Sequence, residues 1–172
     1  IKEHMPEAFD FDIPSVCAIA PGVLGVTGVE TMDIVFGVAN KVKPDLIIAV
    51  DALASRRAAR ISTTIQLSDS GISPGSGVGN TRADLSRANL GVPVIAVGVP
   101  LVVYASTISQ DTISLIADET GLHGDEERLR ELAEQVIAKH MGDFIVTPKD
   151  IDVIVEDMAG IIANAINSAL FG

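Results

Sequence analysis

The sequence predicts an α/β fold in which parallel strands are buried beneath helices. Hydrophobic residues make up 48% of the 172 residues, yet only 3% are aromatic, so the apolar content is aliphatic. Continuous aliphatic runs are typical of parallel strands with both faces covered. These runs alternate with segments of helical periodicity. No linker, repeat or change of composition divides residues 1–172, so we expect a single domain.

The first part of the chain predicts a strand, a helix and a second strand. Residues 15–20 form a short apolar run that ends in a Pro-Gly pair, which is typical of a buried strand followed by a turn. Residues 30–42 carry apolar side chains at helical spacing, with lysines near the end that suit the helix dipole. Residues 45–50 are the second apolar run, predicted to lie parallel to the first. Asp51 would then follow directly at the carboxyl end of this strand.

The remainder of the chain repeats the alternation. Glycines at unusual density predict a loop with special backbone angles between two strands, and the last helix has a Thr-Pro pair at its start. In chain order we expect a strand over 62–67, a glycine-rich loop over 68–80, a strand over 92–99, helices over 102–116 and 125–140, a short strand over 144–146, and a helix with Thr147 as its N-cap and Pro148 as its first residue that continues to Leu170.

Composition excludes several classes of partner and site. Twelve basic and 23 acidic residues give a formal charge of −11, which repels nucleic acid phosphates. No uninterrupted apolar run approaches the ~18–20 residues of a membrane helix, and the start lacks the pattern of an export signal. The lone Cys17 lies in an apolar run and is predicted to be a buried, reduced thiol of a cytosolic protein. The three histidines lack metal-ligand spacing, so we expect no metal and no other cofactor.

Asp51 is the principal candidate for a catalytic residue. Ligands of open α/β sheets gather beyond the carboxyl ends of the strands. Beside an apolar wall, desolvation disfavours the charged form of a carboxyl group, so it can hold a proton while a second carboxylate nearby stays ionised. The alternative is structural: Asp51 caps the following turn or pairs with Arg56 or Arg57.

The glycine-rich loop contains a serine-hydrolase pattern that we interpret as coincidental. Residues 71–75 read Gly-Ile-Ser-Pro-Gly, but the G-x-S-x-G elbow needs a helix directly after its serine, and Pro74 and the later glycines deny one. No lysine follows the glycines as a phosphate loop requires. The glycines either bring backbone amides and carbonyls close to an extended peptide or form only a structural turn.

A basic cluster follows Asp51 at Arg56, Arg57 and Arg60. These side chains either neutralise Asp51 or Asp69, or bind an acidic side chain of a substrate. The sequence leaves both alternatives open.

Several segments together resemble the germination protease of endospore-forming bacteria. The long matching segments are residues 43–56, 62–80 and 90–100, and the shorter ones are residues 20–25, 27–31 and 146–152. The resemblance covers nearly everything from Ser15 onward.

The resemblance implies an atypical aspartic endopeptidase, made as a zymogen, that degrades small acid-soluble spore proteins early in germination. It also implies a homotetramer, located in the cytoplasm of the forespore and spore core. The implied fold is similar to that of the hydrogenase-maturation endopeptidases, with three layers and a mainly parallel twisted sheet between helices.

The resembling family uses two aspartates. One lies in a motif that matches Val50-Asp51-Ala52-Leu53-Ala54, so the resemblance assigns a catalytic role to Asp51. The other belongs to a Thr-Pro-Asp-x-Leu-Gly-Pro motif, and the pair Thr147-Pro148 is not that motif. We therefore expect an amino-terminally truncated fragment that is inactive alone. Two positions depart from the family, because Ser62 stands where it usually has Asn and Tyr104 where it usually has Asp.

The remaining expected site residues bind or support the substrate; they are Arg56, Thr64, Asp69, Gly75, Ser76, Gly77 and Asn80. Two alternative functions stay open. One is a metal-assisted processing endopeptidase of the hydrogenase-maturation type. The other is an inactive folded remnant that at most binds peptides.

Overall fold

The computed structural model describes residues 14–74, 83–121, 124–142 and 144–172. The α/β class predicted from the sequence is confirmed, and most of the expected helices and strands form near their expected positions. In chain order the elements are α1 (Leu24–Thr27), α2 (Thr31–Val42), β1 (Ile47–Ser55), the 3₁₀ helix η2 (Ala58–Arg60), β2 (Gln66–Ser68), α3 (Arg87–Leu90), β3 (Val94–Tyr104), α4 (Ala105–Thr120), α5 (Glu126–His140), β4 (Ile145–Val146) and α6 (Ile151–Phe171).

Strand β3 is the centre of the sheet. It pairs in parallel with β1 from Ile47 opposite Val94 onward. On its other side it pairs antiparallel with β2, and near its end with β4. The parallel pair contributes most of the paired residues, so the sheet is mainly parallel, as the sequence predicts.

A proline within β3 coincides with an irregularity of the ladder. Pro100 has no N–H to donate, and the β1–β3 register shifts just after it, between Leu53 and Ala54. Its carbonyl accepts a hydrogen bond from the Ser62 N–H at 2.7 Å. A bulge of this kind is where a proline can occupy a central strand.

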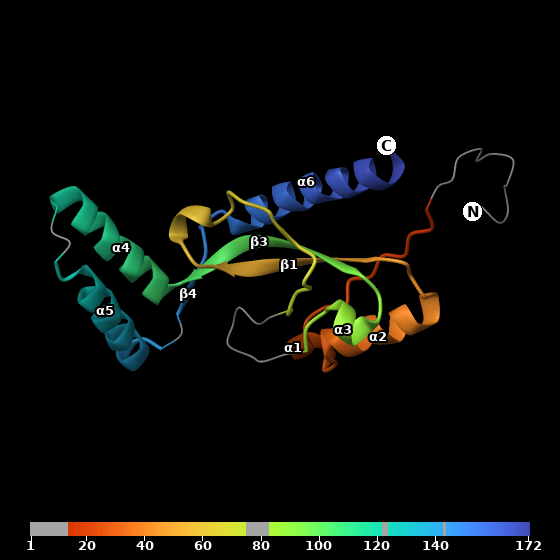
Figure 1. Cartoon of the computed structure of the whole chain (residues 1–172), viewed down its shortest axis with the longest axis horizontal. Helices are drawn as coiled ribbons and strands as arrows, with labels where there is room; N and C mark the ends of the chain where they lie inside the picture. The colour runs from red at the N-terminus through yellow and green to blue at the C-terminus, as the bar shows by residue number, and fades with distance from the viewer. Residues whose placement is uncertain (1–13, 75–82, 122–123, 143) are drawn as a thin grey trace, which may run out of the picture.

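Helices cover both faces of the sheet and give the molecule three layers (Figure 1). Helix α6 packs its Ile162 against Val97 and Val99 of β3. On the opposite face, α2 and α3 pack against a cluster that includes Ala49 and Val94. Helices α4 and α5 lie against each other beyond one end of the sheet.

Helix α6 is long and apolar enough, by length and composition, to cross a membrane. The sequence analysis did not single it out, because its apolar residues are interrupted by polar ones. Met158, Ile162 and Ile166 pack against the sheet, so this helix has the role of a cover for β3 in the structure.

Expectations for residues 15–20, Cys17 and Thr147 were wrong, and the expected strand over 62–67 is limited to Gln66–Ser68. Residues 15–20 form no strand, and Cys17 is exposed rather than buried. An apolar run becomes a strand only when a neighbouring strand completes its hydrogen bonds, and none of the described strands pairs with this segment. Thr147 does not cap α6, because its Oγ1 donates to the Leu101 carbonyl at 3.0 Å and the helix begins after Asp150.

Ser62 adopts a left-handed backbone conformation, with φ at +59°. Its Oγ is buried, and none of the described residues offers it a hydrogen-bond partner. Left-handed geometry costs an L-residue about 1–2 kcal/mol, and Asn adopts it more readily than Ser. The departure from Asn at this position therefore places an unfavourable residue at a strained turn.

We expect Ser62→Gly to raise the free energy of unfolding by about 1 kcal/mol, since glycine has no left-handed penalty and leaves no buried hydroxyl unsatisfied. Ser62→Ala is the matched control, because it removes the hydroxyl and keeps the backbone strain. Urea unfolding of the three chains measures the difference. An Ala variant as stable as the Gly variant would show that the backbone is not strained there.

Candidate functional site

Asp51 lies in the middle of β1, not beyond its end. The strand continues to Ser55 because its parallel pairing with β3 continues, and Asp51 is paired with Gly98. The expectation that the strand stops at Val50 was therefore wrong. Asp51 is half-buried, and its Oδ1 accepts a hydrogen bond from the Ala52 N–H at 2.9 Å. This hydrogen bond holds the carboxyl group beside the backbone of β1.

The surroundings of Asp51 follow from the alternation of side chains along the strands. Asp51 shares a face with Ala49, which belongs to the cluster beneath α2 and α3. Gly98 lies opposite Asp51 and also opposite Gln66 of β2. The Leu53 side chain lies over Gly98, where a Cβ would overlap it. Asp51 therefore borders an apolar floor formed by Leu53 and a residue without a side chain.

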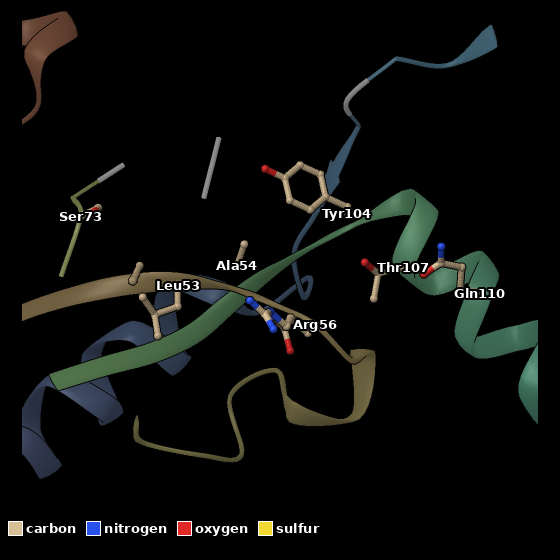
Figure 2. A pocket seen from close by; sticks show the side chains of 9 residues that line it. Leu53, Ala54, Arg56, Ser73, Tyr104, Thr107 and Gln110 are labelled. Carbon is tan, nitrogen blue, oxygen red and sulfur yellow. The ribbon is translucent and has the colours of Figure 1, made fainter. Parts of the chain in front are cut away.

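A cavity of about 600 Å³ begins one residue after Asp51. Figure 2 shows Tyr104, Thr107 and Gln110 on one side of it and Ser73 on another, with β1 residues between them. The lining residues are Ala52, Leu53, Ala54, Ser55, Arg56, Ser73, Tyr104, Thr107 and Gln110. The cavity lies where β1 and β3 end and α4 begins, the edge of a parallel sheet at which ligands usually bind.

Two polar side chains fix the turn that carries Arg56. Ser55 is buried, and its hydroxyl donates to the Arg57 carbonyl at 2.5 Å while accepting from the Arg57 N–H at 3.3 Å. Asp111 of α4 accepts from the Ala58 N–H at 2.7 Å, a bond that joins segments 53 residues apart. Arg56 and Arg57 are exposed and form no ion pair within the described residues, so neither pairs with Asp51.

The base of the glycine-rich loop is built by a short bridge. Ile72 and Leu85 exchange two backbone hydrogen bonds, of 3.1 and 2.7 Å. Gly71 has φ at +94°, and a Cβ there would overlap the backbone at Leu85 and Ser86. Only glycine fits this close approach. The bridge places Ser73, the residue after Ile72, at the cavity.

The other expected site residues differ in their burial and in their distance from Asp51. Thr64 is half-buried, and its hydroxyl donates to the Arg60 carbonyl at 3.5 Å. Asp69 is exposed and follows β2. Because β3 separates β2 from β1, the backbones of Asp51 and Asp69 are more than about 9 Å apart. The remaining expected residues, Gly75, Ser76, Gly77 and Asn80, lie outside the described residues.

The sequence analysis did not identify four residues of the site, which are Ser55, Thr107, Gln110 and Asp111. Tyr104 was noted only as a departure from the family, and the structure places it in the cavity wall. The signal that could have found this group is the start of the predicted helix directly after a strand. Of the histidines, His140 ends α5, and His4 and His123 lie outside the described residues. No cluster of three potential metal ligands occurs in the described ranges.

These features define a three-layer α/β protein with a carboxyl group within its parallel strand pair and a polar cavity beside the ends of the two strands. Comparison with known proteins identifies the family within this class. A family model described as germination protease matches residues 2–129 and 119–172. The chain belongs to the germination protease family.

Individual relatives agree with this assignment. The germination protease of Clostridium acetobutylicum is 46% identical over 99% of this chain, and that of Caldanaerobacter subterraneus is 47% identical over 99%. The germination protease of Bacillus cytotoxicus is 41% identical over 96%. The matched regions cover 56%, 56% and 57% of these relatives, so the chain spans little more than half of their length.

We expect Gly71→Ala to lower the free energy of unfolding by about 2–4 kcal/mol, because the new Cβ meets backbone that must shift and the φ value is unfavourable. Gly121→Ala is the matched control. Gly121 also has a positive φ, of +71°, but open space around its Cβ position, so its replacement should cost only about 1 kcal/mol.

Urea unfolding and amide hydrogen exchange at Ile72 and Leu85 measure both effects. Equal losses in the two variants, with exchange at Leu85 unchanged, would mean that the close approach at Gly71 does not hold the bridge.

Proposed function

We propose that this chain carries one half of the active site of an aspartic-type endopeptidase, with Asp51 as one of its two catalytic carboxyl groups. The substrates are the small acid-soluble proteins of the spore, and the activity belongs to germination. The second carboxyl group comes from the Thr-Pro-Asp region that the resembling family carries in addition to the residues matched here.

The observation that carries the proposal is the position of Asp51. It is a half-buried acid on the strand that supplies five consecutive residues, 52–56, to the wall of the cavity. Asp51 and the first three of these residues belong to the family motif matched by Val50-Asp51-Ala52-Leu53-Ala54. An acid beside a cavity that can accept a peptide has the placement that general acid–base chemistry requires.

The proposed mechanism divides the work between two carboxyl groups. One, ionised, takes a proton from the attacking water, while the other, protonated, donates to the peptide oxygen or to the leaving amine. The apolar floor at Leu53 and Gly98 limits access of bulk water to Asp51 from that side. A single carboxyl group cannot serve both roles at once, so the proposal requires the second acid.

The proposed setting is the cytoplasm of the forespore and spore core, and the proposed assembly is a homo-oligomer, a tetramer by resemblance. Exposed apolar side chains support association with other chains. Leu67 of β2 is 72% exposed and Val153 of α6 is 60% exposed. Apolar surface of this kind is commonly covered by a partner.

We expect Asp51→Asn to reduce peptide hydrolysis by about 10²–10⁴-fold in a chimera that joins this chain to the Thr-Pro-Asp region of a longer relative. The amide keeps the shape of the acid and removes the proton transfer. Hydrolysis of a purified small acid-soluble spore protein measures the rate, and circular dichroism checks the fold.

Asp69→Asn is the matched control, because Asp69 is exposed and separated from Asp51 by β3. Normal cleavage by the folded Asp51→Asn chimera would remove Asp51 from the mechanism. Loss of cleavage in the Asp69→Asn chimera alone would move the catalytic acid to that residue.

A second expectation separates the proposal from other protease classes. Ser73→Ala, serine-directed reagents and chelators should leave the rate of the same chimera unchanged, because neither a serine nucleophile nor a metal takes part. Ser73 lies in the cavity wall after an isolated bridge, so its loss tests the hydrolase pattern directly. Inactivation by Ser73→Ala would favour the serine class, and recovery of activity only on addition of metal would favour the metal-assisted alternative.

A further inference from the structure

Helix α5 packs mainly against α4. Its Glu126 accepts a hydrogen bond from the Ser114 hydroxyl at 2.8 Å, and its Glu134 accepts one from Gln110 Nε2 at 3.0 Å. Both donors belong to α4, so the two glutamates mark the side of α5 that faces α4. Figure 1 shows the two helices beyond one end of the sheet. The sheet therefore does not cover the sides of α5 that point away from α4.

An exposed apolar stripe follows another side of α5. Leu129, Leu132 and Val136 are 49%, 53% and 48% exposed. Their spacing of three and four residues places them on one face of the helix, and we call these three residues the outer stripe. Aliphatic side chains at this spacing are typical of a helix face that packs against a partner helix.

The two ends of the outer stripe carry opposite charges. Asp125 lies one turn before Leu129, and Lys139 lies one turn after Val136, so both charges continue the same face. Both charged side chains are exposed, and neither forms an ion pair within the described residues. The helix dipole alone favours an acid at the start of a helix and a base at its end. It does not explain the exposed apolar residues between them.

The order of these charges makes the face complementary to itself. In an antiparallel pair of identical helices related by a two-fold axis, each contact occurs twice. With the axis near Leu132, Leu129 of one helix lies near Val136 of the second copy. Asp125 of each helix then lies near Lys139 of the other. A parallel pair would set each charge against its like, which is unfavourable.

We propose that the outer stripe of α5 binds the outer stripe of a second copy of this chain, with the two helices antiparallel. The proposal rests on the homo-oligomer of the proposed function, and it assigns one contact of that assembly to named residues. It does not depend on Asp51, because the contact requires neither substrate nor catalysis.

The alternative occupant is the region of the relatives that this chain does not match. The segment that precedes α1 lies toward the end of the molecule away from α5 (Figure 1). Charge also favours the second copy, because the opposite charges at the two ends of the outer stripe provide the complementary surface within this chain. With a formal charge of −11, two copies repel each other as a whole. Their association must therefore arise from local contacts.

The first test is sedimentation equilibrium of this chain. One helix from each copy makes a small interface, so we expect a dissociation constant on the order of 10–100 μM. Leu132→Ser should raise this constant at least about tenfold, because it places a polar group at the centre of the contact. Leu115→Ser is the matched control, because Leu115 of α4 is 64% exposed and lies outside the outer stripe. It should leave the constant unchanged.

Exchange of the two charges tests their pairing. Asp125→Lys and Lys139→Asp should each weaken association by about three- to tenfold, with the circular dichroism spectrum unchanged. An equal mixture of the two variants should associate as tightly as the original chain, because the mixed pair restores both contacts between opposite charges. Glu131→Lys is the matched control, since it changes the net charge as Asp125→Lys does and lies on α5 away from the outer stripe. It should not weaken association.

Thiol cross-linking tests the location and direction of the contact, in chains whose exposed Cys17 is replaced by serine. With a short bismaleimide, the Leu132→Cys chain should cross-link to a second copy of itself. The Asp125→Cys and Lys139→Cys chains should each fail to cross-link alone and should cross-link when mixed. An antiparallel pair requires this pattern, because each end of the helix meets the opposite end of the other.

A chain that stays monomeric up to about 500 μM would overturn the proposal. Association that survives in the folded Leu132→Ser chain would also overturn it, while leaving the homo-oligomer in place through another surface. Self-cross-linking of the Lys139→Cys chain would show a parallel pair and would contradict the proposal. A Thr-Pro-Asp segment of a longer relative that blocks the Leu132→Cys cross-link at equal concentration would assign the outer stripe to that region instead. None of these outcomes bears on the role of Asp51.

Discussion

The parallel pairing of β1 with β3 is the interaction on which the rest of this structure depends. β3 also supplies the ladder partners of β2 and β4, and helices cover it from both faces. The pairing places Asp51 opposite Gly98, and the missing side chain of that glycine leaves room for Leu53 to lie over it. The register shifts after Pro100, and the cavity lies beside the ends of the two strands, where α4 begins.

The sequence predicted the parts of the fold that are set by local pattern. The aliphatic runs at 45–50 and 92–99 became the central pair, and the helical periodicity at 125–140 became α5. The sequence failed where the structure depends on distant partners. β1 extends through Asp51 to Ser55 because β3 continues beside it, whereas residues 15–20 are equally apolar and remain without a ladder among the described strands.

The residues of the candidate site were likewise predictable only where they lie close together in the sequence. Asp51 and Arg56 lie in one contiguous motif, so a single sequence could identify them. Tyr104, Thr107 and Gln110 come to the same cavity from a segment about 50 positions further along, through the register of two strands. Asp111 accepts a single hydrogen bond from a backbone amide in the turn after Arg56. No local pattern in the sequence predicts such a bond.

The central claim is that this chain supplies one catalytic carboxyl group and needs a second from the Thr-Pro-Asp region of the family. The most direct measurement mixes this chain with a separately purified Thr-Pro-Asp segment of a longer relative and follows cleavage of a small acid-soluble spore protein. The account predicts no cleavage by either piece alone and cleavage by the two together. Cleavage of the substrate by this chain alone would contradict it, because both acids would then lie within these residues.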